Sequence, residues 1–205
     1  MPLSLEQGTR LVSIAREAID SVVERKTSPA GIREEVGAND GFLNVKRGAF
    51  VTLNDLDGGL RGCIGIPYPI RSLQEATVEA AVSAATRDPR FPSVEPDELD
   101  SLTIEVSALT APEVLQCKPH ELPNHVRIGT DGLIVSGMGT SGLLLPQVAT
   151  DMRLTPEKFL SLTCQKAGLF PDAWMSPNVR VQRFQAEIFT EATPRGAVGE
   201  LKEPA

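Results

Sequence analysis

The order of the apolar segments is the feature that most constrains what this chain can fold into. Residues 50–53 and 60–66 are separated by a stretch at 54–59 that has the turn residues of a β-hairpin loop. Residues 133–136 and 143–145 flank a glycine-rich loop in the same way. Helix-like segments lie between these pairs without a regular strand–helix alternation. This order favours an α+β fold with antiparallel sheets over a doubly wound parallel sheet.

Helix-capping residues mark where the helices begin and end. Ser4 with Gln7, and Ser72 with Glu75, have the spacing of capping boxes, and each pair precedes apolar residues at helical spacing. Thr155 has the position of an N-cap ahead of a proline at the first helical position. The predicted helices cover 5–26, a short stretch at 32–36, 73–87 and 156–167.

Two further strands are predicted nearer the end of the chain. Residues 102–108 alternate strictly between apolar and polar side chains, which is typical of a half-buried strand. Residues 179–191 have the composition of one long strand whose apolar phase shifts between Val181 and Phe184, and we interpret this shift as a bulge. From Pro194 onward the chain is polar, so we expect a flexible tail there.

Charge and composition exclude some classes of function. The net charge of −7 disfavours binding to phosphate backbones and to anionic membranes. Aromatic residues make up only 4% of the chain, which leaves few platforms for stacking bases. The N-terminus lacks the features of a signal peptide, and the three cysteines are too few and too widely spaced for a disulfide framework. We expect a cytoplasmic protein that binds neither nucleic acid nor membrane.

Cys63 lies in the segment LRGCIG, residues 60–65, on the second strand of the first hairpin. Strand periodicity predicts that Arg61 and Cys63 share one face, where a guanidinium would favour the thiolate form of the cysteine. Gly62 and Gly65 would let a ligand approach the backbone. The same residues also fit a packing role, with a buried cysteine and glycines that accommodate an alanine-rich helix. Both interpretations remain open.

Weaker candidates for ligand binding lie elsewhere in the chain. Arg90 follows a helix end and has the charge to bind an anion, while Phe91 beside it has the size to cover a pocket. Glu105 and Ser107 share the polar face of their strand, and Gln147 follows a proline in a predicted loop. Each also fits a structural role, as a loop anchor, a solvated strand face or a backbone hydrogen-bond donor.

Two other patterns suggest sites that their context does not support. Residues 137–142 read GxGxxG, but a short apolar stretch ended by a proline follows in place of the helix that a dinucleotide site requires. Cys117, His120 and His125 do not have the spacing of a closed zinc site, so we predict no metal site. No cofactor is indicated by the residues.

The chain resembles the AMMECR domain family over about residues 5–190. The resemblance is carried by short motifs that occur in the family's order: LRGCIG at 60–65, DPRFP at 88–92, IEVS at 104–107, GTDGL at 129–133, LLPQV at 144–148 and KAG at 166–168.

The resemblance implies one domain over 1–193 and a tail at 194–205. The domain would have a larger subdomain containing both termini and a smaller one formed by a central insertion, each with an antiparallel sheet flanked by helices, and a cleft centred on Cys63 and Arg61. No established reaction is implied. Microbial relatives are associated with Memo-like and radical S-adenosylmethionine (SAM) proteins, which suggests a modification pathway, and this chain lacks the CxxxCxxC motif of a radical enzyme.

Two classes of function therefore stay open. In one, the chain is a cysteine-dependent enzyme acting on a small molecule or peptide, with Cys63 as nucleophile and Arg61 stabilising it. In the other, the same surface belongs to a non-catalytic adaptor that binds Memo-like and radical SAM proteins.

Overall fold

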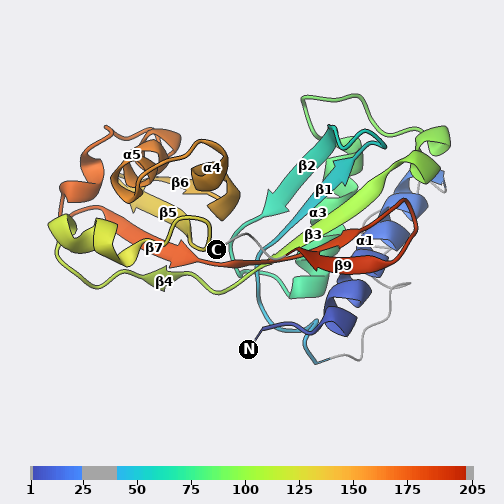
Figure 1. The fold of residues 1–205 in the computed structure, drawn as a ribbon, viewed down its shortest axis with the longest axis horizontal. Helices are drawn as coiled ribbons and strands as arrows, with labels where there is room; N and C mark the ends of the chain where they lie inside the picture. Colours follow the sequence, from blue (N-terminus) through green and yellow to red (C-terminus); the bar gives the residue numbers. More distant parts are fainter. Residues whose placement is uncertain (1, 25–40, 202–205) are drawn as a thin grey trace. The chain divides into compact units, whose positions relative to one another are not determined.

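The structure is a computed structural model that describes residues 2–24 and 41–201. The short helix predicted at 32–36 lies outside the described residues. Within them the chain divides into two compact units, the first formed by residues 2–24, 41–109 and 187–201 and the second by residues 110–186. The predicted α+β class with antiparallel sheets is confirmed (Figure 1).

The first unit is built on a five-stranded sheet with helices on one face (Figure 1). Both predicted capping boxes form, since the Ser4 and Ser72 hydroxyls accept backbone hydrogen bonds from Gln7 and Glu75. The helices are α1 (Leu5–Glu24) and α3 (Leu73–Thr86). In spatial order the strands are β2 (Leu60–Ile66), β1 (Ala49–Asn54), β3 (Thr103–Leu109), β8 (Ala186–Glu191) and β9 (Val198–Leu201).

The alternation of the strands gives this sheet one apolar and one polar face. Val51 and Leu53 of β1, and Ile104 and Val106 of β3, are fully buried in the core that α1 and α3 cover. Their neighbours in sequence must point the other way. We call this second surface the helix-free face; it carries Phe50, Thr52, Cys63, Gly65, Glu105 and Ser107.

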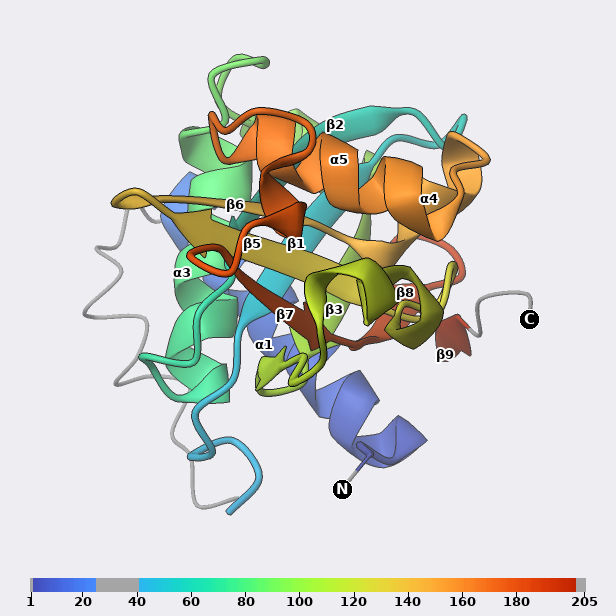
Figure 2. The same ribbon diagram turned by 90° about the vertical axis from the view of Figure 1, so that its left-hand side faces the viewer.

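The second unit has a four-stranded sheet packed against helices (Figure 2). The predicted helix after Thr155 is α5 (Pro156–Lys166), and its buried side chains Phe159, Leu160 and Cys164 form the centre of this unit's core. A short helix α4 (Pro146–Asp151) precedes it. In spatial order the strands are β4 (Glu113–Val114), β7 (Arg180–Phe184), β5 (Gly132–Gly137) and β6 (Thr140–Leu144).

The GxGxxG stretch forms the turn of the β5–β6 hairpin. Gly137 is opposite Thr140, so Met138 and Gly139 are the two turn residues. Both have positive φ, 53° and 79°, as a type I′ turn requires. A strand and not a helix follows the turn, so this stretch lacks the helix N-terminus of a dinucleotide site.

The predicted long strand at 179–191 is two strands that belong to different sheets. β7 pairs with β4 and β5, whereas β8 lies between β3 and β9, and Gln185 separates them. The predicted bulge is therefore wrong. The apolar phase changes because β7 packs on the core of the second unit and β8 on the core of the first.

The last described segment also differs from the sequence-based expectation. β9 falls within the stretch for which a flexible tail is predicted, yet residues 198–201 pair with β8 in antiparallel register. Val198 packs on the core of the first unit, which explains why so polar a segment forms a strand.

Candidate functional site

Cys63 lies on β2, an edge strand of the five-stranded sheet. One side of β2 pairs with β1, and on the other side the loop after α3 hydrogen-bonds the Cys63 backbone. Its N–H donates to Asp88 Oδ2 at 2.8 Å, and its carbonyl accepts from Arg90 Nη2 at 3.2 Å. Asp88 and Arg90 thus replace a neighbouring strand at this one residue and fix its backbone.

Asp88 and Arg90 form a tight ion pair beside Cys63. Arg90 donates from Nε and Nη2 to the two carboxylate oxygens of Asp88, at 2.9 and 2.7 Å. The Arg90 guanidinium lowers the pKa of the nearly buried Asp88 carboxyl far below its usual value, although burial acts in the opposite direction. Hydrogen bonding to Asp88 in turn raises the pKa of Arg90.

Arg61 binds Glu98 and loop carbonyls. Its Nε and Nη2 donate to the two Glu98 carboxylate oxygens, at 2.7 and 3.0 Å, and its Nη1 donates to the Pro92 carbonyl at 3.0 Å. The bidentate contact lowers the pKa of Glu98. The pairing of β1 with β2 shifts here, because Leu53 is opposite Gly62 and Asn54 is opposite Leu60. This irregularity interrupts the alternation that predicts Arg61 beside Cys63.

Phe91 joins the two arginines of the motif regions. The Arg61 guanidinium lies 6.0 Å from the centre of the Phe91 ring, and that of Arg90 lies 5.4 Å from it. Both distances are within the range of cation–π attraction. The LRGCIG and DPRFP motifs are therefore two halves of one cluster, which holds the loop after α3 against the edge of β2.

Two glycines of LRGCIG meet bulky neighbours. A Cβ on Gly62 would lie 2.4 Å from the Ala84 carbonyl oxygen of α3, so the close approach of helix and strand needs a glycine there. A Cβ on Gly65 would lie 2.2 Å from the Phe50 ring. In this structure both glycines accommodate packing.

The helix-free face brings three reactive side chains into one row across the sheet. Thr52 of β1 is opposite both Cys63 of β2 and Glu105 of β3. The Thr52 hydroxyl donates to the Cys63 sulfur at 3.4 Å. Burial raises the pKa of the Glu105 carboxyl, which favours its protonated form. Thiol, hydroxyl and carboxyl are thus neighbours at the spacing of adjacent strands.

The remaining predicted ligand residues are divided between the two units. Ser107 is buried and lies two residues along β3 from Glu105 on the same face, where it is opposite Phe50. Gln147 lies in α4 of the second unit, and its Oε1 atom is buried without a hydrogen-bond partner among the described residues.

Sequence reasoning missed Thr52, Asp88 and Glu98. Asp88-Pro89 appears in the sequence as a helix stop, which conceals the role of the carboxylate at the strand edge. Glu98 belongs to η1 (Pro96–Ser101), a 3₁₀-helix with no apolar periodicity to mark it. The position of Thr52 opposite Cys63 can be predicted from the hairpin, but only when the register shift at Arg61 is known.

In the described part of the chain, no three His, Cys, Asp or Glu side chains gather in a way that would hold a metal ion. Among the same residues, no helix has both the length and the apolar character needed to cross a bilayer.

Known proteins match this chain over nearly its full length. The family model AMMECR1 matches residues 12–189. A protein of Thermococcus gammatolerans is 49% identical over 197 residues, covering 94% of each chain, and one of Thermofilum pendens is 46% identical over 208 residues, covering 97% of this chain and 96% of that one. The crystal structure of the uncharacterized protein PH0010 from Pyrococcus horikoshii superposes with a TM-score of 0.84 at 43% identity, covering 97% of this chain and 98% of that one. This chain belongs to the AMMECR1 family.

Proposed function

We propose that the chain is a cysteine-dependent enzyme of a modification pathway, with its active site on the helix-free face. The observation that carries the proposal is the row of Cys63, Thr52 and Glu105 across three adjacent strands. Cross-strand neighbours have Cβ atoms about 5 Å apart, so Cys63 and Glu105 are separated by roughly twice that distance. A substrate group would fit between them, above Thr52.

The row has the chemical groups that a covalent transfer needs. The Thr52 hydroxyl donates to the Cys63 sulfur and holds it in place, and the sulfur would attack as the thiolate after releasing its proton to solvent. The sulfur forms a bond to an electrophilic carbon of the substrate while that carbon's bond to its leaving group breaks. Burial favours the protonated form of Glu105, which donates the proton that the leaving group takes up. Arg61 and Arg90 hold the loop and strand in place.

The first prediction concerns how fast each cysteine reacts with iodoacetamide at pH 7. Burial raises the pKa of the thiols of Cys117 and Cys164, so both serve as slow internal references for Cys63. We expect Cys63 to be alkylated fastest. Replacing Thr52→Val should slow the reaction of Cys63 by about 2- to 10-fold, the value of one hydrogen bond. Mass spectrometry of the digested protein separates the three sites.

A matched substitution tests whether the effect is local. The Thr9 hydroxyl donates to the Leu5 carbonyl on the exposed side of α1, so Thr9→Val makes the same chemical change away from the row. It should leave the Cys63 rate unchanged. Alkylation of Cys63 no faster than that of Cys117 would refute the proposal.

The alternative is a non-catalytic adaptor that binds Memo-like and radical SAM proteins. It is supported by apolar side chains directly after β2, where Ile70 is 69% exposed and Tyr68 is 38% exposed. Exposed apolar residues of this kind are common in protein interfaces. A Cys63→Ser protein that retains full function in cells would favour the adaptor, whereas turnover by the isolated protein that this substitution abolishes would favour the enzyme.

A further inference from the structure

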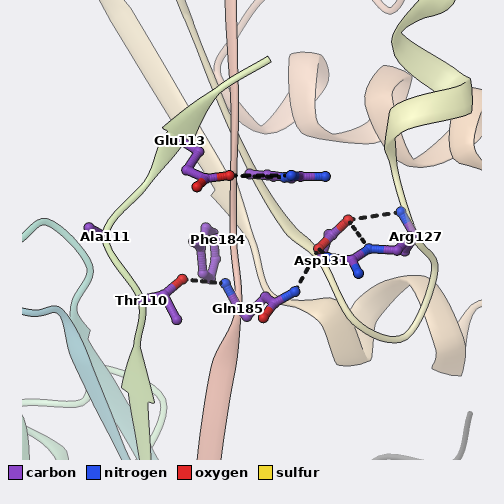
Figure 3. Close-up of a pocket in the computed structure, with 8 residues that line it drawn as sticks. Thr110, Ala111, Glu113, Arg127, Asp131, Phe184 and Gln185 are labelled. Atoms are coloured by element: carbon purple, nitrogen blue, oxygen red, sulfur yellow. Dashed lines mark hydrogen bonds and ion pairs between the residues drawn. The ribbon is translucent and has the colours of Figure 1, made fainter. Parts of the chain in front are cut away.

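The second unit contains a cavity of about 450 Å³ that the proposed active site does not use (Figure 3). It lies where β4 and β7 meet the loop before β5, and this volume is within the range of small-molecule sites. Its walls contain two arginines, two carboxylates and a few neutral side chains: Thr110, Ala111, Glu113, Arg127, Asp131, Arg183, Phe184 and Gln185.

Protein groups satisfy the hydrogen-bonding capacity of one of the two carboxylates in the cavity. Asp131 is completely buried and accepts hydrogen bonds from the Arg127 backbone N–H and Nε, at 3.0 and 3.2 Å, on one oxygen. The other oxygen accepts from Arg127 Nη2 at 3.0 Å and from the Gln185 side-chain amide at 3.3 Å (Figure 3). Arg127 and Asp131 therefore form a neutral, saturated pair that fixes the loop.

The second ion pair is much weaker. Arg183 contacts a single oxygen of Glu113 from Nε and Nη2, at 3.4 and 3.3 Å, and the Glu113 side chain is 71% exposed. Exposed pairs of this kind contribute little free energy. The Arg183 side chain is only 32% exposed, so its guanidinium is the more enclosed partner. Glu113 therefore occupies the position of an anionic ligand beside Arg183 but binds Arg183 only weakly.

We propose that this cavity binds a small monocarboxylic acid, whose carboxylate replaces that of Glu113 on Arg183. Arginine binds planar carboxylates through two parallel N–H groups, and the long contacts to Glu113 do not use that geometry. The Thr110 hydroxyl accepts from the Gln185 N–H at 2.9 Å, which leaves its own proton free to donate to the ligand. Ala111 and Phe184 provide apolar contacts for a short hydrocarbon chain.

The surrounding charges favour a single negative charge on the ligand. Arg127 neutralises Asp131, so Arg183 is the positive charge left for the ligand, and Glu113 on β4 is directly opposite Arg183 in the sheet register, so it remains close after it is displaced. A dianion such as phosphate would carry one charge more than Arg183 balances and would meet Glu113, and like charges at close range repel.

The test is a titration of the full chain with butyrate, followed by the NMR signal of the Gln185 backbone amide, which lies at the cavity and is present in every variant used. We expect a Kd of about 1–10 mM, as befits so small a ligand. Butyramide, the neutral isostere, should not shift this signal. Arg183→Gln should weaken butyrate binding by at least about 10-fold through loss of the charge-assisted hydrogen bonds. Glu113→Gln should strengthen it by about 2- to 5-fold, because the competing carboxylate is removed.

Arg180→Gln is the matched control, since Arg180 is an exposed arginine of the same strand that does not line the cavity. It should leave the Kd unchanged. Glu113→Gln is expected to increase the affinity for butyrate, so this variant tests the proposal even if Arg183→Gln fails to fold. The proposal is overturned if butyramide or phosphate binds as tightly as butyrate, if Glu113→Gln does not strengthen binding, or if butyrate does not bind up to about 100 mM.

Discussion

Replacing Glu191→Ala is expected to destabilise the protein by about 3–5 kcal/mol, because it leaves a buried arginine without its counter-charge. Arg16 of α1 and Glu191 of β8 are both buried in the first unit and form a bidentate ion pair. Glu191 also accepts the Ile104 N–H at 3.1 Å, and Arg16 donates to the Leu99 and Leu102 carbonyls. This ion pair thus links a helix, two strands and a 3₁₀-helix. Urea unfolding at pH 7 measures the loss.

A second arginine–glutamate pair on the same helix provides the control. Glu17 lies 3.7 Å from Arg10, and both side chains are more than a third exposed. Glu17→Ala should therefore cost less than about 1 kcal/mol. Equal losses for the two substitutions would show that burial does not set the strength of these pairs.

The substitution Asp88→Asn is expected to cost about 2–4 kcal/mol at pH 7, since it removes the charge that both Arg90 and the Cys63 N–H require. An asparagine keeps the shape but turns one acceptor into a donor, which then faces either Arg90 or Cys63. Arg90 is half exposed, so solvent compensates for part of the loss. The Cys63 backbone should also become more mobile, with faster hydrogen exchange at its amide.

The cost of this substitution should depend on pH in one direction. The folded-state pKa of Asp88 lies below the unfolded value of about 3.9, so its contribution is fully present above that value and is lost as the pH falls below it. The difference in unfolding free energy between the native chain and Asp88→Asn should therefore be constant from pH 7 to about 5 and shrink toward pH 3. A difference that grows on acidification would contradict the assigned ion pair.

Local signals in the sequence predict most of the fold. Capping residues such as Ser72 and Thr155 satisfy the same backbone donors wherever they occur, so they mark helix starts without tertiary context. The stretch at 179–191 shows the limit of such reasoning. A change of apolar phase within one strand looks the same in sequence whether the strand bulges or passes from one core to another, and only the pairing partners of β7 and β8 distinguish the two.

The candidate site was predictable only in part, because its geometry depends on contacts between distant segments. Cys63 and its strand follow from the hairpin pattern, and the position of Gly62 under an alanine-rich helix follows from residue size. The partner of Arg61 cannot be predicted in this way, since Glu98 is distant in sequence and the irregular strand pairing at Arg61 has no local signature. Long-range ion pairs of this kind leave no periodic pattern in a single sequence.

The insertion of the second unit between β3 and β8 has a consequence for the order in which the chain folds. These strands are neighbours in one sheet, yet residues 110–185 separate them in sequence. Joining such distant segments is slow when the intervening chain is unfolded. Prior folding of the second unit would remove this obstacle, because Thr110 donates its N–H to the Gln185 carbonyl at 2.8 Å and so holds the two ends of the insertion together. β3 and β8 would then emerge side by side, and the larger sheet would close as if a short turn connected them.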